Sequence, residues 1–216
     1  MEQITKPITV VKQEFIEKMV NEVDQAFLLA IFEGIRGEGF SELANLKISD
    51  LVKEEEVCFI NLKDDSKTET RKAKISKELY NLLYAANAQQ DYLTPGTLRK
   101  NPFQESEYIF KKVRKGNHSG STKIDTGHAL RKLLMFKKVF EDAHLRYESI
   151  VQSGMMCMAY QIYKEKGTIA REDIVKISEQ YGQPKAINIS TLKEKIFHES
   201  MTDLYPDFDF TADKVK

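Results

Sequence analysis

The 216-residue sequence predicts a mainly α-helical fold that contains one small antiparallel sheet. Two observations carry this prediction. Apolar residues recur every four positions from Lys12 to Glu33, which is the spacing of one helix face. Val57–Leu62 has the strongest strand pattern in the chain, and a polar turn and the alternating run Arg71–Ile75 follow it. Such a pair of runs is typical of a small hairpin.

The elements around this hairpin are predicted from their breakers and caps. The first helix ends at a cluster of glycines, and a second short helix is predicted from Phe40 to Leu51 with Ser41 as its cap. Ser76 is expected to begin the helix that follows the hairpin. Residues 91–107 contain Pro-Gly and Asn-Pro pairs, which predict a loop.

Further helices are predicted after this loop. Asp125 or Thr126 can cap the first of them. The side chains predicted to face the core on this helix are Leu130, Leu133, Leu134, Val139 and Phe140. A long helix is predicted from about Tyr147 to Lys166, with Gly167 as its end. Helices near residues 171–181 and 190–198 complete the predicted body.

Composition limits the classes of function. The 33 basic and 33 acidic side chains balance, which argues against a purely electrostatic DNA binder but not against a local basic patch. The acidic excess of the last eighteen residues leaves a mildly basic body. No apolar run reaches transmembrane length, and the first residues do not show a signal-peptide pattern. Cys58 and Cys157 have no metal-spaced partner. We therefore predict a cytoplasmic protein with no metal, no cofactor and no membrane contact.

Two separated motifs combine arginine and histidine. The first places Arg36 just after the predicted first helix and continues into the Ser-Glu-Leu run of Ser41–Leu43. In the second, His128 and Arg131 are three residues apart and therefore lie on one face of a helix. A guanidinium group matches phosphate oxygens with two parallel hydrogen bonds. These side chains, brought together, would form a phosphate socket.

The order and spacing of these motifs resemble the tyrosine recombinase (phage integrase) superfamily. His128 follows Arg36 by 92 residues, with the hairpin between them, and the resemblance covers about residues 12–165. It implies the fold of a recombinase catalytic domain over residues 1–166, with a helical extension and an acidic tail over 167–216. The N-terminal core-binding domain that such enzymes carry is expected to be absent.

The resemblance also implies roles for individual residues. Arg36, His128 and Arg131 would hydrogen-bond the scissile phosphate. Lys67 in the hairpin turn would donate a proton to the leaving oxygen, with Lys63 as the reserve, although lysines are common in solvated turns. Three residues are inserted between Arg36 and the Ser-Glu pair, relative to the superfamily pattern.

The resemblance weakens toward the expected nucleophile. Ser153 or Met155 stands where the superfamily places a histidine or tryptophan ring donor. Tyr163 is the implied nucleophile and Tyr160 the reserve. Alternatively, both tyrosines only pack their helix onto the core. A tyrosine hydroxyl, with a pKa near ~10, is a poor nucleophile until positive charge and hydrogen bonds activate it. The missing ring donor weakens that activation.

A basic, glycine-containing stretch leads into the His128 motif. Lysine and arginine supply sequence-independent affinity for the DNA backbone by counterion release. We therefore predict a DNA-contacting track beside the socket, with an ordinary solvated loop as the alternative. The basic residues of this stretch are Lys111, Lys112, Arg114, Lys115, His118 and Lys123.

The departures from the superfamily pattern favour a regulator over an enzyme. In the sequence motif around Arg36, the absent ring donor and the long tail, the chain resembles recombinase-like master repressors of the lytic cycle in SPbeta-type Bacillus prophages. This resemblance implies a transcription repressor that maintains lysogeny by binding double-stranded operator DNA in the nucleoid of the bacterial host. The alternative is an active integrase that recombines DNA through a 3′-phosphotyrosyl intermediate.

The C-terminal region is less informative. Residues 171–196 have helix–turn–helix proportions, but two short helices joined by a loop are common. The run Tyr205–Phe210 alternates aromatic and acidic residues. Docking of this tail on a second copy, which would make a homo-oligomer, and docking on the chain's own basic face are equally compatible with the sequence.

Overall fold

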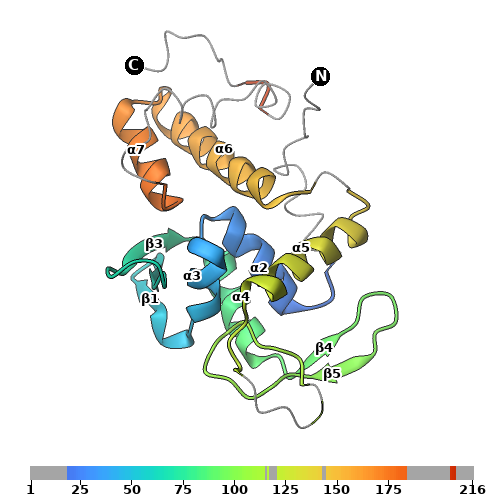
Figure 1. Cartoon of the computed structure of the whole chain (residues 1–216). Helices are drawn as coiled ribbons and strands as arrows, with labels where there is room; N and C mark the ends of the chain where they lie inside the picture. The colour runs from blue at the N-terminus through green and yellow to red at the C-terminus, as the bar shows by residue number, and fades with distance from the viewer. Residues whose placement is uncertain (1–18, 115, 117–120, 143–144, 184–204, 208–216) are drawn as a thin grey trace.

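The computed structural model describes residues 19–114, 116, 121–142, 145–183 and 205–207 (Figure 1). Its helices are α2 (Glu22–Phe32), η2 (Glu38–Phe40), α3 (Ser41–Asn45), η3 (Ile48–Asp50), α4 (Lys77–Ala88), α5 (Thr126–Val139), α6 (Tyr147–Lys166) and α7 (Arg171–Gln180). Its strands are β1 (Leu51–Glu54), β2 (Val57–Leu62), β3 (Arg71–Ile75), β4 (Asp91–Leu93) and β5 (Lys100–Pro102). The predicted class, mainly helical with a small antiparallel sheet, is confirmed.

Helix α2 forms the centre of the core, and its sequence is apolar on nearly every side. Residues 26–32 are all buried, because α2 packs against α4 on one side and α6 on the other (Figure 1). The predicted helix start at Lys12 lies outside the described residues. Within the described part, the helix begins only at Glu22.

The predicted hairpin is confirmed as strands β2 and β3, which pair antiparallel with Ile60 opposite Ala73. Side chains alternate along β2, so that Cys58, Ile60 and Leu62 face the core. A third strand, β1, extends this sheet on the other edge of β2. The sequence did not indicate it, because a four-residue edge strand is too short to show a clear alternation.

Three predictions for the loops and short helices were wrong. The region from Phe40 to Leu51 is not one helix. It contains the end of η2, the short helix α3, the 3₁₀ turn η3 and the first residue of β1. Ser41 is not its cap, because its hydroxyl donates to Asp64 instead. Residues 91–107 contain the hairpin of β4 and β5. These short strands pair through backbone hydrogen bonds, which leave little signal in side-chain pattern.

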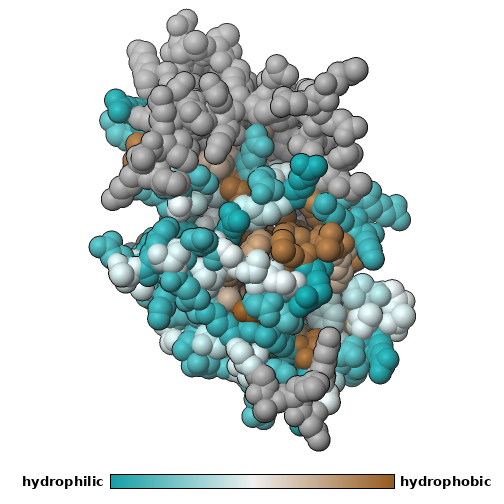
Figure 2. Space-filling view, in the orientation of Figure 1, coloured by the Kyte–Doolittle hydropathy of each residue, from teal (hydrophilic) through white to brown (hydrophobic). Residues whose placement is uncertain are grey.

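Helix α5 begins where predicted, and the predicted core face is right for Leu133, which is buried, and for Phe140, which packs against the core, but wrong for two other leucines. It buries Ala129, Leu133 and Phe136, and the ring of Phe136 lies 6.2 Å from that of Phe27. Leu130 and Leu134, predicted to face the core, are 49% and 55% exposed. Apolar residues occupy more than one face of this helix, and only the face toward α2 can be buried. The others contribute to an apolar patch visible over α5 in Figure 2.

The long helix α6 and the following helix α7 match the predicted ranges, and Gly167 ends α6 in the left-handed conformation. Gly154 lets α6 approach α2 closely, because a Cβ at this position would lie 1.8 Å from the carbonyl oxygen of Phe32. The helix predicted at residues 190–198 lies outside the described residues. Among those described, no helix is both long enough and apolar enough to cross a membrane.

Candidate phosphate-binding site

Arg36 lies in the loop between α2 and η2, and its guanidinium group is held against aromatic rings. The guanidinium carbon is 3.9 Å from the centre of the Tyr147 ring and 5.4 Å from that of Phe40. Its Nε is buried and has no hydrogen-bond acceptor among the described residues. Burial raises the pKa of the Tyr147 hydroxyl, and the nearby Arg36 charge opposes that rise. Tyr147 therefore stays neutral beside the arginine.

The three inserted residues Gly37–Gly39 form a turn that joins two other elements of the site. Asp64, in the hairpin turn, accepts hydrogen bonds from the Glu38 amide at 3.2 Å and the Ser41 hydroxyl at 2.8 Å. On the other side, the Thr126 hydroxyl donates to the carbonyl oxygen of Gly39 at 2.8 Å. The insertion thus ties the Arg36 loop to the hairpin and to the start of α5.

Asp64 itself is a buried carboxylate with an unusually low pKa. Burial alone would raise its pKa, but hydrogen bonds from Ser66, Ser41 and Glu38 outweigh burial and lower the pKa to about 2. The Ser66 amide and hydroxyl donate at 3.0 and 2.8 Å. The charged carboxylate therefore organises the hairpin turn and the inserted turn together at neutral pH.

The N-terminus of α5 carries the second motif. Asp125, one of the two predicted caps, caps the helix by accepting a hydrogen bond from the His128 amide at 3.0 Å. The imidazole Nδ1 of His128 lies 2.9 Å from the same carboxylate, and the Lys112 ammonium lies 3.4 Å from it. The contact with His128, supported by Lys112, holds the pKa of Asp125 well below its usual range. The carboxylate lies beside the imidazole and offsets part of the Lys112 charge, but Nδ1 of His128 is buried without a hydrogen-bond partner among the described residues.

Arg131 follows one turn later on the exposed side of α5, and the described residues provide no ion pair for it. Gly127 leaves room beside it, because a Cβ there would lie 3.3 Å from an Arg131 Nη. A helix N-terminus already favours anions through its free amides. The two motifs predicted from sequence are thus carried by adjoining elements, joined at the bond between Thr126 and Gly39.

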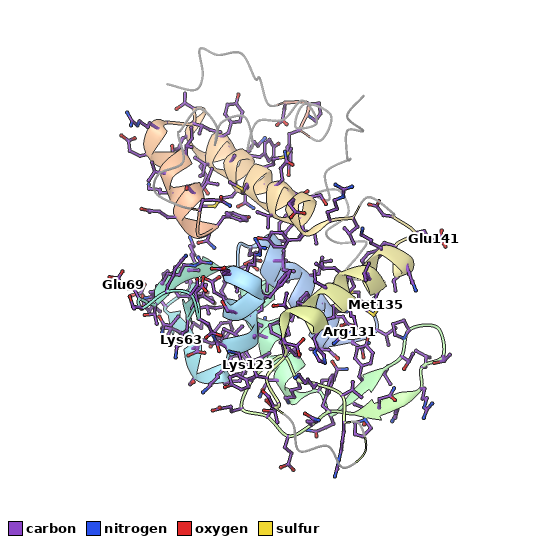
Figure 3. The ribbon with its side chains drawn as sticks, viewed as in Figure 1. Lys63, Glu69, Lys123, Arg131, Met135 and Glu141 are labelled. Atoms are coloured by element: carbon purple, nitrogen blue, oxygen red, sulfur yellow. The ribbon has the colours of Figure 1, made fainter. Side chains whose placement is uncertain are left out.

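The candidate lysines of the hairpin and the neighbouring stretch occupy different environments. Lys67 is exposed in the hairpin turn, 3.8 Å from the Asp64 carboxylate, and Lys63 is exposed at the end of β2. Lys123 pairs with Asp65 at 2.8 Å. Figure 3 shows Lys63, Lys123 and Arg131 following one another across the viewed face, from the hairpin to α5.

The predicted basic track is not uniform. The Lys111 ammonium donates to the Asn87 carbonyl at the end of α4, and burial lowers its pKa. Lys111 therefore serves an internal contact. Arg114 is exposed, whereas Lys115 and His118 lie outside the described residues.

The helix with the candidate tyrosines does not place a ring donor at the expected position. Ser153 is fully buried, and its hydroxyl donates to the Ser149 carbonyl of the preceding turn at 2.8 Å. Met155 is 2% exposed. Both side chains therefore belong to the core between α6 and its neighbours.

The two candidate tyrosines also differ. The Tyr160 hydroxyl donates to the Asp207 carboxylate at 2.9 Å, and its ring stacks on Tyr205 at 4.0 Å. Lys164 pairs with the same carboxylate at 3.0 Å. The described tail segment thus docks on α6 of its own chain. Tyr163 is half-buried and packs against the hydrophobic core.

Several residues of the site carried no warning in the sequence. Tyr147 begins a predicted helix, and nothing in its position marks it as the ring that covers Arg36. Asp64 was one of several polar residues in a turn. Glu42 was noted only as part of a motif, and Arg71 only as the start of a strand. The structure pairs the two, with the Arg71 Nε 2.6 Å from the buried Glu42 carboxylate, and no spacing in the sequence indicates this pair.

Comparison with known proteins places this arrangement in a family. The family described as MrpR, C-terminal catalytic domain, matches residues 9–206. The SPbeta prophage-derived uncharacterized protein YopR of Bacillus subtilis (strain 168) is 30% identical over 167 residues, which cover 73% of this chain and 50% of YopR. The chain therefore spans about half the length of this curated relative.

Solved structures show the same fold at low sequence identity. The XerA recombinase superposes with a TM-score of 0.63 at 16% identity, over 96% of this chain and 64% of XerA. The XerH site-specific recombinase, bound to palindromic difH substrate in a post-cleavage complex, superposes with a TM-score of 0.55 at 15% identity, over 91% of this chain and 50% of XerH. The predicted tyrosine recombinase catalytic fold is confirmed, and the chain belongs to the family of the MrpR C-terminal catalytic domain.

Proposed function

We propose that this chain binds double-stranded DNA as part of a phage transcription repressor that maintains lysogeny, on a recombinase scaffold that no longer cuts DNA. Arg36, His128 and Arg131 contact phosphates of the DNA backbone. Lys67 and Lys123 extend the contact along the same face. The repressor acts in the nucleoid of the bacterial host.

One observation carries this proposal. A hydrogen bond joins the Arg36 loop to helix α5, which bears Arg131, whereas α6, which bears the candidate tyrosines, packs into the core. The Thr126 hydroxyl and the Gly39 carbonyl join the Arg36 loop to α5. By contrast, Ser153 lies buried where a ring donor is expected. This contrast supports a scaffold that keeps the predicted phosphate socket and has lost the predicted activation of a nucleophile.

The unsatisfied Arg36 Nε supports a phosphate ligand. A buried donor without an acceptor costs about 1–3 kcal/mol, and a phosphate oxygen is an acceptor that matches the guanidinium group. The Tyr147 ring restricts the guanidinium plane before any ligand arrives. A preorganised arginine loses less side-chain entropy on binding.

The relatives support the same setting. YopR is described as prophage-derived, which agrees with a phage protein. The XerH structures contain its difH substrate, in both pre-cleavage and post-cleavage complexes. The shared fold therefore offers a surface of suitable shape for DNA.

An active recombinase is the second candidate, and Tyr163 is the residue that favours it. It stays at the predicted spacing on the continuous helix α6. In that reaction the Tyr163 hydroxyl loses its proton to water as its oxygen attacks the phosphorus. The 5′ oxygen of the next nucleotide leaves with a proton from Lys67, and a 3′-phosphotyrosyl bond remains. No metal takes part in these steps.

The binding proposal is tested by the salt dependence of affinity for a 30-base-pair duplex of arbitrary sequence. Arg131→Ala should weaken binding about tenfold and lower the slope of log K against log salt by about 0.9, because one phosphate contact is lost. Lys138→Ala, on the last turn of the same helix, is the matched control and should change both quantities little. Unchanged binding by Arg131→Ala would refute the socket.

The choice between repressor and recombinase is tested with nicked suicide DNA substrates. We expect no protein–DNA adduct that survives denaturing electrophoresis. An adduct that disappears in Tyr163→Phe would establish the recombinase instead. An adduct that disappears only in Tyr160→Phe would do the same and assign the other tyrosine.

A further inference from the structure

Arg71, the first residue of β3, uses four of its five N–H groups within the chain. Its Nε and Nη2 donate to the two oxygens of the Glu42 carboxylate at 2.6 and 2.8 Å. Nη2 also donates to the Gly34 carbonyl at 2.7 Å, and Nη1 donates to the Gln180 carbonyl at 2.8 Å. The Arg71 side chain is 22% exposed and that of Glu42 only 3%. Such a bidentate, partly buried pair is among the strong hydrogen-bonded contacts.

Glu42 passes this contact on to Arg36. The same carboxylate accepts a hydrogen bond from the Arg36 amide at 2.9 Å. Arg71 therefore contacts the loop on both sides of Ile35, directly at Gly34 and through Glu42 at Arg36. Because both contacts lie within two residues of the Arg36 side chain, they fix the direction in which that side chain leaves the backbone.

The end of α7 is built onto the same loop. The side-chain Nε2 of Gln180 donates to the backbone carbonyl of Glu33 at 2.9 Å and to that of Lys74 at 2.7 Å. The Tyr181 hydroxyl donates to the Phe32 carbonyl at 2.6 Å. Gly34 permits this approach, because a Cβ there would lie 2.8 Å from the Gln180 carbonyl oxygen. Arg71 sits where α7, β3 and the Arg36 loop meet.

We infer that Arg71 is a positioning residue for Arg36, which locks the loop between α2 and η2 to the end of α7 and does not itself touch DNA. The inference rests on the proposed DNA-binding function and assigns an indirect role in it to a basic residue outside the socket. Loss of Arg71 then weakens DNA binding only through Arg36. The four internal hydrogen bonds leave its guanidinium group little capacity for a phosphate.

A double-mutant cycle on the full chain separates positioning from direct contact. The affinity for the 30-base-pair duplex and its salt slope are measured for Arg36→Ala, Arg71→Ala and the double variant. We expect each single variant to bind about tenfold more weakly, with a slope lower by about 0.9. The double variant should bind within about twofold of Arg36→Ala, because the second substitution has no contact left to disturb. Losses that multiply, to about a hundredfold, would overturn the inference.

Two further variants guard against a trivial effect of charge or folding. Lys72→Ala removes the next basic residue of β3, whose ammonium pairs with the exposed Glu54, and should leave affinity within about twofold of the parent. Arg71→Lys keeps the charge but cannot span both carboxylate oxygens. It should resemble Arg71→Ala in the direction of every change. Parental affinity in a folded Arg71→Lys would contradict the inference, because charge alone would then suffice.

Hydrogen exchange measured by mass spectrometry provides a readout that needs no DNA. Arg71→Ala and Arg71→Lys should speed exchange in the peptide that spans residues 34–42, and Lys72→Ala should not. Unchanged exchange there would overturn the inference even if DNA binding fell. If Arg36→Ala leaves DNA binding intact, the proposed function fails, and the exchange result alone decides whether Arg71 positions the loop.

Discussion

The two ends of the candidate site are built in opposite ways. Around Arg36, buried carboxylates and short loops hold an arginine whose Nε still has no acceptor among the described residues. On α6, the groups at the positions predicted to be catalytic already have internal contacts: the Ser153 hydroxyl donates to the preceding turn, Tyr160 donates to Asp207, and Tyr163 packs against the core. On the proposed function, this difference makes holding a phosphate and activating a nucleophile separable properties of one fold. Four variants test this contrast, from the largest expected effect to the smallest.

The largest effect is expected at the contact that builds α6 into the core. Gly154→Ala places a Cβ 1.8 Å from the Phe32 carbonyl oxygen and 2.3 Å from the Tyr181 hydroxyl. We expect the free energy of unfolding to fall by about 3 kcal/mol or more, because backbone atoms must move apart. Urea unfolding measures it. Gly154 has no positive φ, so its loss would come from the clash alone, whereas Gly96→Ala meets nothing within 4 Å and strains only a backbone at φ +83°. The loss at Gly96 should be the smaller of the two, and an equal or larger loss there would contradict close packing of α6.

Asp64 tests the support of the Arg36 loop. Its pKa falls from 3.8 to about 2 on folding, which corresponds to about 2 kcal/mol of stability. Because the folded pKa is the lower one, this stability is present above the unfolded pKa and is lost as the pH falls toward 2. Asp64→Asn should therefore be less stable by about 2 kcal/mol at neutral pH, and the gap to the parent should close in acid.

Unfolding midpoints measured between about pH 7 and pH 2.5 check this pH dependence. Asp65→Asn is the matched control from the same turn. Its carboxylate is largely exposed and pairs with Lys123, so a smaller loss is expected. A gap that widens in acid would have the wrong sign for Asp64 and would exclude it as the support of the loop.

Tyr147 tests whether the ring prepares Arg36 for a phosphate. Tyr147→Leu removes the cation–π contact at 3.9 Å, and DNA affinity should fall about fivefold, or about 1 kcal/mol. Tyr147→Phe keeps the ring and should bind as the parent does. Fluorescence anisotropy with labelled duplex DNA gives both affinities. Equal losses in the two variants would assign the effect to the hydroxyl instead.

The smallest effect is expected at the tail contact. The hydrogen bond to Asp207 raises the pKa of Tyr160, so Asp207→Ala should lower that pKa toward its ordinary value. The thermal midpoint should hardly move, because the contact is exposed. Tyrosine ring NMR across the alkaline range reports the titration. An unchanged Tyr160 pKa would show that the tail does not hold this hydroxyl in solution.

Local signals in the sequence predicted local structure well. Ser76 and Asp125 each cap a helix as predicted, because the cap depends only on a side chain and an amide three residues later. Gly167 ends α6 for a similar reason. By contrast, the exposed faces of Leu130 and Leu134 were assigned to the core. Which side of an apolar helix is covered depends on the neighbour that packs against it, and periodicity cannot name that neighbour.

The contacts that support the candidate site were beyond local reasoning. Arg71 and Gln180 are 109 residues apart in the chain, and their hydrogen bond exists only once α7 has packed beside the sheet. The same holds for Thr126 and Gly39, which are 87 residues apart. No spacing rule connects such pairs, because the path between them runs through separate elements.

The sequence by itself determined the helical class, the hairpin, the caps and the order of the Arg36 and His128–Arg131 motifs, all of which depend on short-range periodicity and spacing. Only the tertiary structure decided what surrounds these motifs. It placed Tyr147 over Arg36, bonded the inserted turn to both the hairpin and α5, and buried Ser153 within the core. The physical reason is that burial and hydrogen-bond partners are set by the packing of distant elements, which local sequence does not encode.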